Sequence, residues 1–99
     1  MFKKRRGIKL PYNKQGLIYF ACMNKDAMSE EDREKLKKIC KETAGEEYAE
    51  SLHTLVTDDT LNVHGVEARY NTSSSRLYDR RRKFYYKVAP KIKIVITDE

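Results

Sequence analysis

The chain has 99 residues, which fits one small domain and excludes a second hydrophobic core. Its 21 Lys and Arg residues outnumber 15 Asp and Glu residues, and the resulting formal charge of +6 suits an acidic partner. The longest apolar stretch, residues 17–23, is far shorter than the roughly 20 residues that span a membrane, so we expect no membrane insertion. Two cysteines are too few for a secreted disulfide scaffold, so we expect reduced thiols and a cytoplasmic protein.

The charge is divided into three blocks along the chain. Seven basic and no acidic residues give +7 over residues 1–25, five basic and 12 acidic residues give −7 over residues 26–67, and nine basic and three acidic residues give +6 over residues 68–99. This pattern predicts that both ends approach a polyanion while the middle forms a scaffold. We therefore divide the single domain, residues 1–99, into a basic arm (1–12), supporting helices (13–57), a pair of helices (58–89) and a tail or edge strand (90–99).

A first helix is predicted after Pro11, with Asn13 as its N-cap and its end near Asn24. The same residues also fit a strand, because residues 12–16 have the chemistry of a turn. The isoleucines at positions 92, 94 and 96 alternate with other residues in the same way near the C-terminus. Under this alternative, the two ends of the chain add a short β pairing.

Two further helices are predicted in the acidic middle of the chain. Ser29 and Asp32 resemble a capping box, and a helix from about Glu30 to Thr43 ends at a left-handed stop at Ala44-Gly45. After Gly45, one helical face carries Tyr48, Ala49, Leu52, Leu55 and Val56, and the opposite face carries Glu46, Glu47, Glu50 and Ser51.

Two helices that meet at a tight corner are predicted between residues 57 and 88. The first is capped by Thr60 or by one of the preceding residues Asp58 and Asp59, and one side of it carries Val63, Val66 and Tyr70. Asn71 tolerates a left-handed turn, and the hydroxyls of residues 72–75 offer N-caps for the second helix. In that helix Leu77, Phe84 and Tyr85 point inward, and the outward side carries Ser75, Arg76, Asp79, Arg82, Lys83 and Tyr86.

Residues 60–88 resemble the helix-turn-helix of sigma-factor region 4 and of small prophage-encoded transcription regulators. The resemblance is carried by inward Val66 and Tyr70, turn residue Asn71, capping Ser73, inward Leu77 and an Arg-rich helix that ends in Phe84-Tyr85. The chain departs from the family at Glu67, where alanine is usual, and at Thr72, where a larger aliphatic residue is common. The periodicity and the resemblance together predict an all-α bundle of four to five helices with a C-terminal helix-turn-helix at residues 58–89.

The resemblance implies a sequence-specific DNA-binding transcription regulator of phage or mobile-element type, in a bacterial or phage-infected cell. The helix Ser73 to Val88 then reads the major groove, because an exposed helical face can offer donors to base edges. Base contacts are expected from Ser75, Arg76, Asp79, Arg82 and Lys83, although a pair between Asp79 and Lys83 is favoured over a cytosine contact. Phosphate contacts are expected from Lys3, Lys4, Arg5 and Arg6 in a flexible arm, and from Ser74, Tyr78, Arg80, Arg81, Tyr86 and Lys87.

No catalytic residue, metal site or cofactor is expected. His53 and His64 lie on different predicted helices without ligands at zinc spacing, the glycines are scattered singly, and the serines at 73–75 suit a helix cap better than a nucleophile. Double-stranded DNA is the expected partner, and RNA is less favoured because no stacking platform is predicted. A small phage-type inhibitor or adaptor that binds RNA polymerase, another nucleic-acid enzyme or its RNA is the alternative. A solvated basic helix without a partner also fits, as do a monomer and a dimer.

Overall fold

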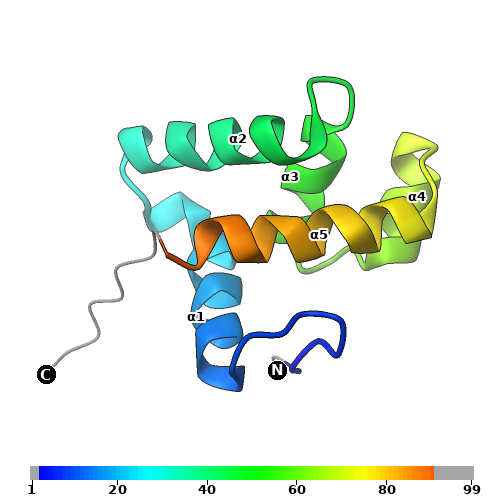
Figure 1. Cartoon of the computed structure of the whole chain (residues 1–99). Coiled ribbons are helices and arrows are strands. Elements are labelled where there is room, and N and C mark those ends of the chain that lie inside the picture. The colour runs from blue at the N-terminus through cyan, green and yellow to red at the C-terminus, as the bar shows by residue number, and fades with distance from the viewer. Residues whose placement is uncertain (1–2, 91–99) are drawn as a thin grey trace, which may run out of the picture.

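Five α-helices form the regular structure in the computed structural model, which describes residues 3–90 (Figure 1). They are α1 (Tyr12–Met23), α2 (Glu30–Ala44), α3 (Ala49–Thr57), α4 (Val63–Tyr70) and α5 (Ser74–Val88), with one 3-10 turn, η1 (Lys25–Ala27). The prediction of a small all-α bundle is confirmed, and α4 and α5 follow one another across the turn at Asn71. None of the helices in the described part of the chain is long and apolar enough to cross a membrane.

Helix α5 lies at the centre of the arrangement and touches each of the other four α-helices. In Figure 1 it runs across the front of the molecule, with α2 above it and the N-terminal segment below it. Its buried side joins two apolar clusters. Phe84 is fully buried in the main core with Ile18, Cys40 and Leu52, whereas Leu77 packs in a smaller core against residues of α3 and α4. Removal of side chains of this size from water stabilises a fold by about 1.5–3 kcal/mol each.

Several helix ends follow from local sequence and were predicted correctly. The Ser29 hydroxyl accepts a hydrogen bond from the Asp32 amide at 3.1 Å, and the Ser73 hydroxyl accepts one from the Arg76 amide at 3.2 Å. Gly45 ends α2 with a φ of +84°, and Asn71 ends α4 in the left-handed region with a φ of 53°. Glycine and asparagine adopt positive φ at the least cost, so these positions fix where the chain turns.

The first helix begins two residues earlier than an N-cap at Asn13 would allow. Pro11 takes the extended N-cap conformation, and its carbonyl accepts the first helical hydrogen bond from Gln15. The Asn13 side chain accepts only from its neighbour, the Lys14 amide, so Asn13 is not the N-cap. Because residues 12–23 are helical, the strand alternative for this segment is wrong. Its proposed partners at positions 92, 94 and 96, within the predicted tail, lie outside the described residues.

The structure corrects two further expectations, one on the cap of α4 and one on the position of Ser51. Asn62 caps α4, because its side chain accepts from the Gly65 amide at 2.9 Å. Asp58 is unavailable as that cap because its carboxylate accepts from the Thr60 amide within a preceding turn. Ser51, expected on the polar face, is buried, and its hydroxyl donates to the Tyr48 carbonyl at 2.9 Å, which satisfies it inside the fold.

Candidate nucleic-acid interface

The corner between α4 and α5 is held by a side chain that the predicted family pattern does not contain. The Glu67 carboxylate accepts a hydrogen bond from the Ser74 amide at 2.9 Å, and the Glu67 carbonyl accepts one from the Thr72 amide at 3.4 Å. A carboxylate at this place satisfies one of the unpaired amides of the α5 N-terminus and complements the helix dipole. Glu67 therefore joins the two helices where alanine would only pack.

The N-terminal segment is held against the helices. Gln15 is fully buried, and its side chain accepts from the Arg5 amide at 2.9 Å and donates to the carbonyls of Ile8 at 2.9 Å and Leu10 at 3.0 Å. Ile8 is itself buried in the main core. The Lys9 amide donates to the Tyr86 hydroxyl at 2.7 Å. The expectation of a flexible arm at Lys3 to Arg6 is therefore wrong at Arg5, whose amide is bound by the buried Gln15 side chain. The following residues are anchored by the burial of Ile8.

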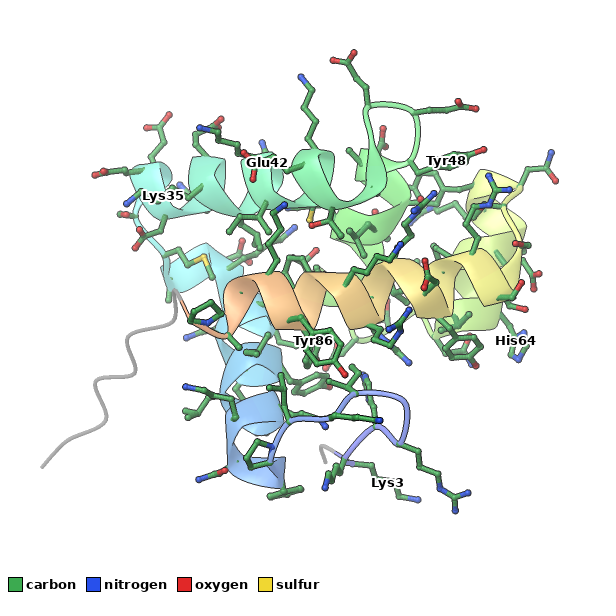
Figure 2. All side chains as sticks on the ribbon, viewed as in Figure 1. Lys3, Lys35, Glu42, Tyr48, His64 and Tyr86 are labelled. Carbon is green, nitrogen blue, oxygen red and sulfur yellow. The ribbon has the colours of Figure 1, made fainter. Side chains whose placement is uncertain are left out.

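The segment 3–10 and α5 adjoin, and we call the two together the basic layer. Residues 5–8 bound a common cavity of about 400 Å³ with four residues of α5, which are Tyr78, Asp79, Arg81 and Arg82. The basic layer holds 11 Lys and Arg residues and one acidic residue, Asp79, for a net charge of +10, so the remainder of the chain carries −4. Figure 2 shows Lys3 of this layer and Glu42 of α2 on opposite sides of α5. Positive charge is thus concentrated in the basic layer, and the rest of the chain has a net negative charge.

Asp79 forms ion pairs with two basic residues on the outward side of α5. Its carboxylate accepts a hydrogen bond from Arg82 and lies 3.2 Å from the Lys83 ammonium. The hydrogen bonds from Arg82 and then Lys83 hold the pKa of Asp79 below its ordinary value. The favoured pair between Asp79 and Lys83 is confirmed. Three of the five expected base-contacting residues therefore form one cluster of ion pairs, with side chains about half exposed.

The other two expected base contacts differ in their surroundings. Ser75 is exposed on the first turn of α5. Arg76 is also exposed, but its guanidinium donates to the Tyr48 hydroxyl at 2.8 Å and lies 5.1 Å from the centre of that ring. Tyr48, labelled in Figure 2, belongs to the connection between α2 and α3. The sequence pattern predicted only that Tyr48 lies on an apolar helical face.

The expected phosphate contacts fall into two groups. Exposed side chains are those of Lys3, Lys4, Arg6, Tyr78 and Lys87. Half-buried side chains are those of Arg5, Ser74, Arg80, Arg81 and Tyr86. Arg80 and Arg81 were expected on the open flanks of α5, and the packing of neighbouring segments against α5 reduces their exposure. Only the first group is fully presented to a partner on the surface.

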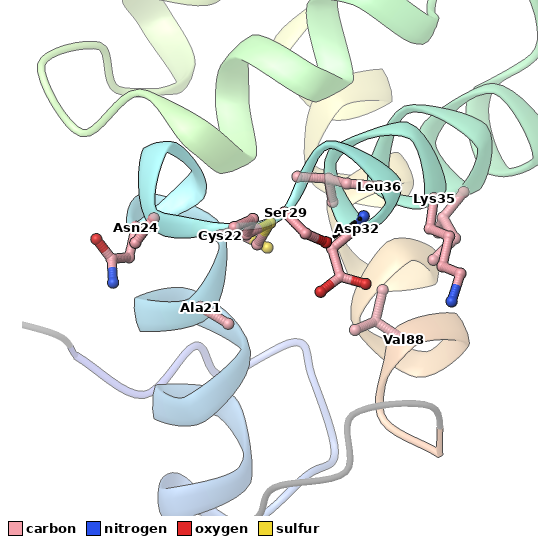
Figure 3. A pocket seen from close by; sticks show the side chains of 11 residues that line it. Ala21, Cys22, Asn24, Ser29, Asp32, Lys35, Leu36 and Val88 are labelled. Atoms are coloured by element: carbon pink, nitrogen blue, oxygen red, sulfur yellow. Dashed lines mark hydrogen bonds between the residues drawn. The ribbon is translucent and has the colours of Figure 1, made fainter.

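A second hollow lies at the other end of the bundle. A cavity of about 820 Å³ separates the end of α1 from the start of α2, and Cys22, Leu36 and Val88 contribute to its apolar lining (Figure 3). The Ser29 cap of α2 stands at its edge, and Asp32 and Lys35 are its charged residues. Within residues 3–90, no group of three or more His, Cys, Asp or Glu residues is placed to hold a metal ion.

The fold is that of a small all-α bundle, and its residues 3–10 and α5 form a strongly basic layer. The chain matches no family model, no curated protein and no solved structure.

Proposed function

We propose that the protein binds double-stranded DNA through the basic layer and acts as a transcription regulator of phage or mobile-element type. The observation that supports this most is the net charge of +10 in two adjoining segments of a chain whose total is +6. Such a concentration of charge attracts a polyanion and releases its counterions on binding.

The shape of α5 suits the major groove. Its 15 residues extend over about 22 Å at 1.5 Å per residue, and the B-DNA major groove, about 12 Å wide, admits an α-helix. Ser75, Asp79 and Lys83 follow one another at four-residue intervals on the outward side. Lys3, Lys4 and Arg6 project from the neighbouring segment, where they are available to phosphates.

To contact bases, Arg82 and Lys83 must break their ion pairs with Asp79 and form hydrogen bonds with a base edge instead. Half-exposed ion pairs of this kind contribute only about 0–1 kcal/mol, so the exchange is easily compensated by a contact to guanine. We therefore propose that phosphate contacts provide most of the affinity and that Arg82 and Lys83 provide the sequence preference.

The test is a salt-series titration of duplex DNA followed by fluorescence anisotropy. With six to eight phosphate contacts, the slope of log affinity against log salt is expected near −5 to −7, from about −0.9 per contact. The triple variant Lys3→Gln, Lys4→Gln, Arg6→Gln should lower the magnitude of the slope by about 2 to 3. These side chains are exposed, so the variant should fold.

The matched control is Lys35→Gln, Lys37→Gln, Lys38→Gln, which removes the same charge from the exposed face of α2. Equal losses in both triple variants, or a flat salt response, would overturn the proposal. A structured RNA in the same titration tests the hypothesis that the protein binds RNA. An absence of binding to either nucleic acid would overturn the proposal and favour the inhibitor or adaptor alternative.

A further inference from the structure

The side chain of Gln15 is committed to the backbone of the N-terminal segment. Gln15 is fully buried near the start of α1, where it accepts a hydrogen bond from the Arg5 amide and donates to the carbonyls of Ile8 and Leu10. A buried amide group is costly unless its hydrogen bonds are made, and an apolar side chain would fill the same space without this requirement. Gln15 therefore determines the path of residues 5–10 rather than only filling the core.

Tyr86 attaches the same segment to α5. Its hydroxyl accepts a hydrogen bond from the Lys9 amide at 2.7 Å, and its ring packs against the main core. Earlier in the segment, Arg5 and Tyr78 line the cavity of about 400 Å³ together. Figure 2 shows Tyr86 and Lys3 on the same side of α5. The segment thus lies along α5, with Lys9 beside Tyr86 and Arg5 near Tyr78.

This arrangement brings like charges together. The segment has four exposed cations, and within residues 3–90 none of them lies within ion-pair distance of a carboxylate; they are Lys3, Lys4, Arg6 and Lys9. Helix α5 adds six Lys and Arg residues, and its one carboxylate, Asp79, is already paired with two cations of the same helix. Asp58 and Asp59 line a cavity with Arg5 but form no ion pair with the four exposed cations of the described segment. The attachment therefore costs electrostatic free energy in the free protein, and a polyanion that spans both segments reverses this cost.

We propose that Gln15 and Tyr86 are positioning residues for DNA binding, which hold residues 3–10 beside α5 so that both segments contact one duplex as a preformed surface. The inference rests on the proposed function. A segment that is ordered before binding loses little conformational entropy when Lys3, Lys4 and Arg6 contact phosphates. Because Gln15 is fully buried, DNA cannot reach it, and any effect of its replacement on affinity must act through another part of the protein.

The test is a double-mutant cycle between Gln15→Leu and the triple variant Lys3→Gln, Lys4→Gln, Arg6→Gln, with duplex affinity measured by fluorescence anisotropy at one salt concentration. In the otherwise wild-type chain, Gln15→Leu should weaken binding by about tenfold, which equals about 1.4 kcal/mol, the cost of ordering the backbone of about one residue. In the triple variant, where the segment has lost its phosphate contacts, Gln15→Leu should weaken binding by about twofold or less. Each variant is compared at a temperature at which circular dichroism shows it to be folded.

Ile39→Ala is the matched control for a general loss of stability. Ile39 is half-buried on α2 and packs against the main core, outside the basic layer. Its truncation should lower the melting temperature and leave duplex affinity unchanged. Equal weakening of duplex binding by Ile39→Ala and Gln15→Leu would show that any loss of stability weakens binding, which would overturn the proposal.

Tyr86→Phe keeps the proposal testable if Gln15→Leu folds poorly, because it retains the ring in the core and removes only the hydroxyl. It should weaken duplex binding by about threefold in the otherwise wild-type chain and have no effect in the triple variant. A hydroxyl that contacts a phosphate directly would instead cost the same in both backgrounds. Tyr78→Phe, which removes an exposed hydroxyl of α5, is the comparison and should have equal effects in the two backgrounds.

Two other results would overturn the proposal. One is wild-type affinity in folded Gln15→Leu and Tyr86→Phe, which would show that the segment contacts DNA equally well as a flexible arm. The other is an equal loss of affinity in both backgrounds, which would show that neither residue acts through Lys3, Lys4 and Arg6. A wild type without salt-dependent binding to duplex DNA would instead remove the proposed function, and this inference with it. The failure of the positioning role and the failure of the DNA proposal are therefore distinguished.

Discussion

Arg76 and Tyr48 join the first turn of α5 to the connection between α2 and α3. The guanidinium donates to the tyrosine hydroxyl at 2.8 Å and lies over the same ring, although the two residues are 28 positions apart. A hydrogen bond and a cation–π contact on one side chain restrain both its position and its direction. The pair therefore fixes how α5 begins relative to the supporting helices, and it occupies an arginine that was expected to contact bases.

Replacement of Tyr48 by phenylalanine should separate these two contacts. Tyr48→Phe keeps the ring and removes the hydroxyl, so we expect the free energy of unfolding to fall by about 0.5–1 kcal/mol, measured by urea denaturation. Arg76→Ala should cost more, because it also removes the contact with the ring. In a double-mutant cycle, the double variant should cost about as much as Arg76→Ala alone. Additive losses would show that the pair contributes no coupling.

Removal of the Asp79 carboxylate should strengthen binding to DNA of any sequence. Asp79→Asn frees Arg82 and Lys83 and raises the net charge of the basic layer, so the salt slope on random duplex DNA should steepen by about 1. Affinity for a selected target site should rise at least as much, because Arg82 and Lys83, which we propose to contact bases, no longer have to leave Asp79. The control, Asp26→Asn in η1, changes the charge equally outside the basic layer. The same steepening in both variants would refute the role of Asp79.

Loss of the buried Gln15 amide should release the N-terminal segment. Gln15→Leu keeps similar volume but leaves the Arg5 amide and two carbonyls without their partners, and each buried unpaired group costs about 1–3 kcal/mol. We expect lower stability and faster tryptic cleavage after Lys3 to Lys9 while the rest of the chain stays intact. Lys14→Gln, at the adjacent half-buried position, is the control. Equal cleavage rates in Gln15→Leu and the wild type would contradict the anchoring role.

Features that depend on a few consecutive residues could be predicted from the sequence. The caps at Ser29 and Ser73, the turn at Asn71 and the inward direction of Leu77 and Phe84 each follow from neighbours within one or two helical turns. The all-α class follows from the sum of such signals. The pairing of Asp79 with Lys83 is also local, at a separation of four residues.

Features that depend on distant partners could not be predicted in this way. From the sequence, Gln15 is an ordinary polar residue of the first helix. Its burial is favourable only because its side chain forms hydrogen bonds with three backbone groups of residues 5–10. Tyr48 became a partner of Arg76 only through the packing of α2 against α5. Arg81 did leave a sequence signal, since an arginine four residues from both Leu77 and Tyr85 interrupts an apolar helical face.

The two buried thiols make the fold sensitive to alkaline pH. Cys22 and Cys40 are almost fully buried in the main core, and burial raises the pKa of each to about 12 from an ordinary value of 9.0. The folded state thus binds these protons more tightly than the unfolded state. Stability from this source is fully present below pH 9, and it decreases as the pH rises from 9 toward 12.

Between pH 8 and 10 we expect each thiol to reduce the free energy of unfolding by about 1 kcal/mol, because only the unfolded chain ionises in this range. Urea denaturation across the range should show a smaller decrease in Cys22→Ala, which removes one of the two groups. The comparison uses the pH slope, since the cavity left by the smaller side chain lowers stability at every pH. Native thiols should also react slowly with a thiol reagent at pH 8 and quickly in urea. A flat stability profile, or rapid reaction in the native state, would show that the thiols are accessible to water.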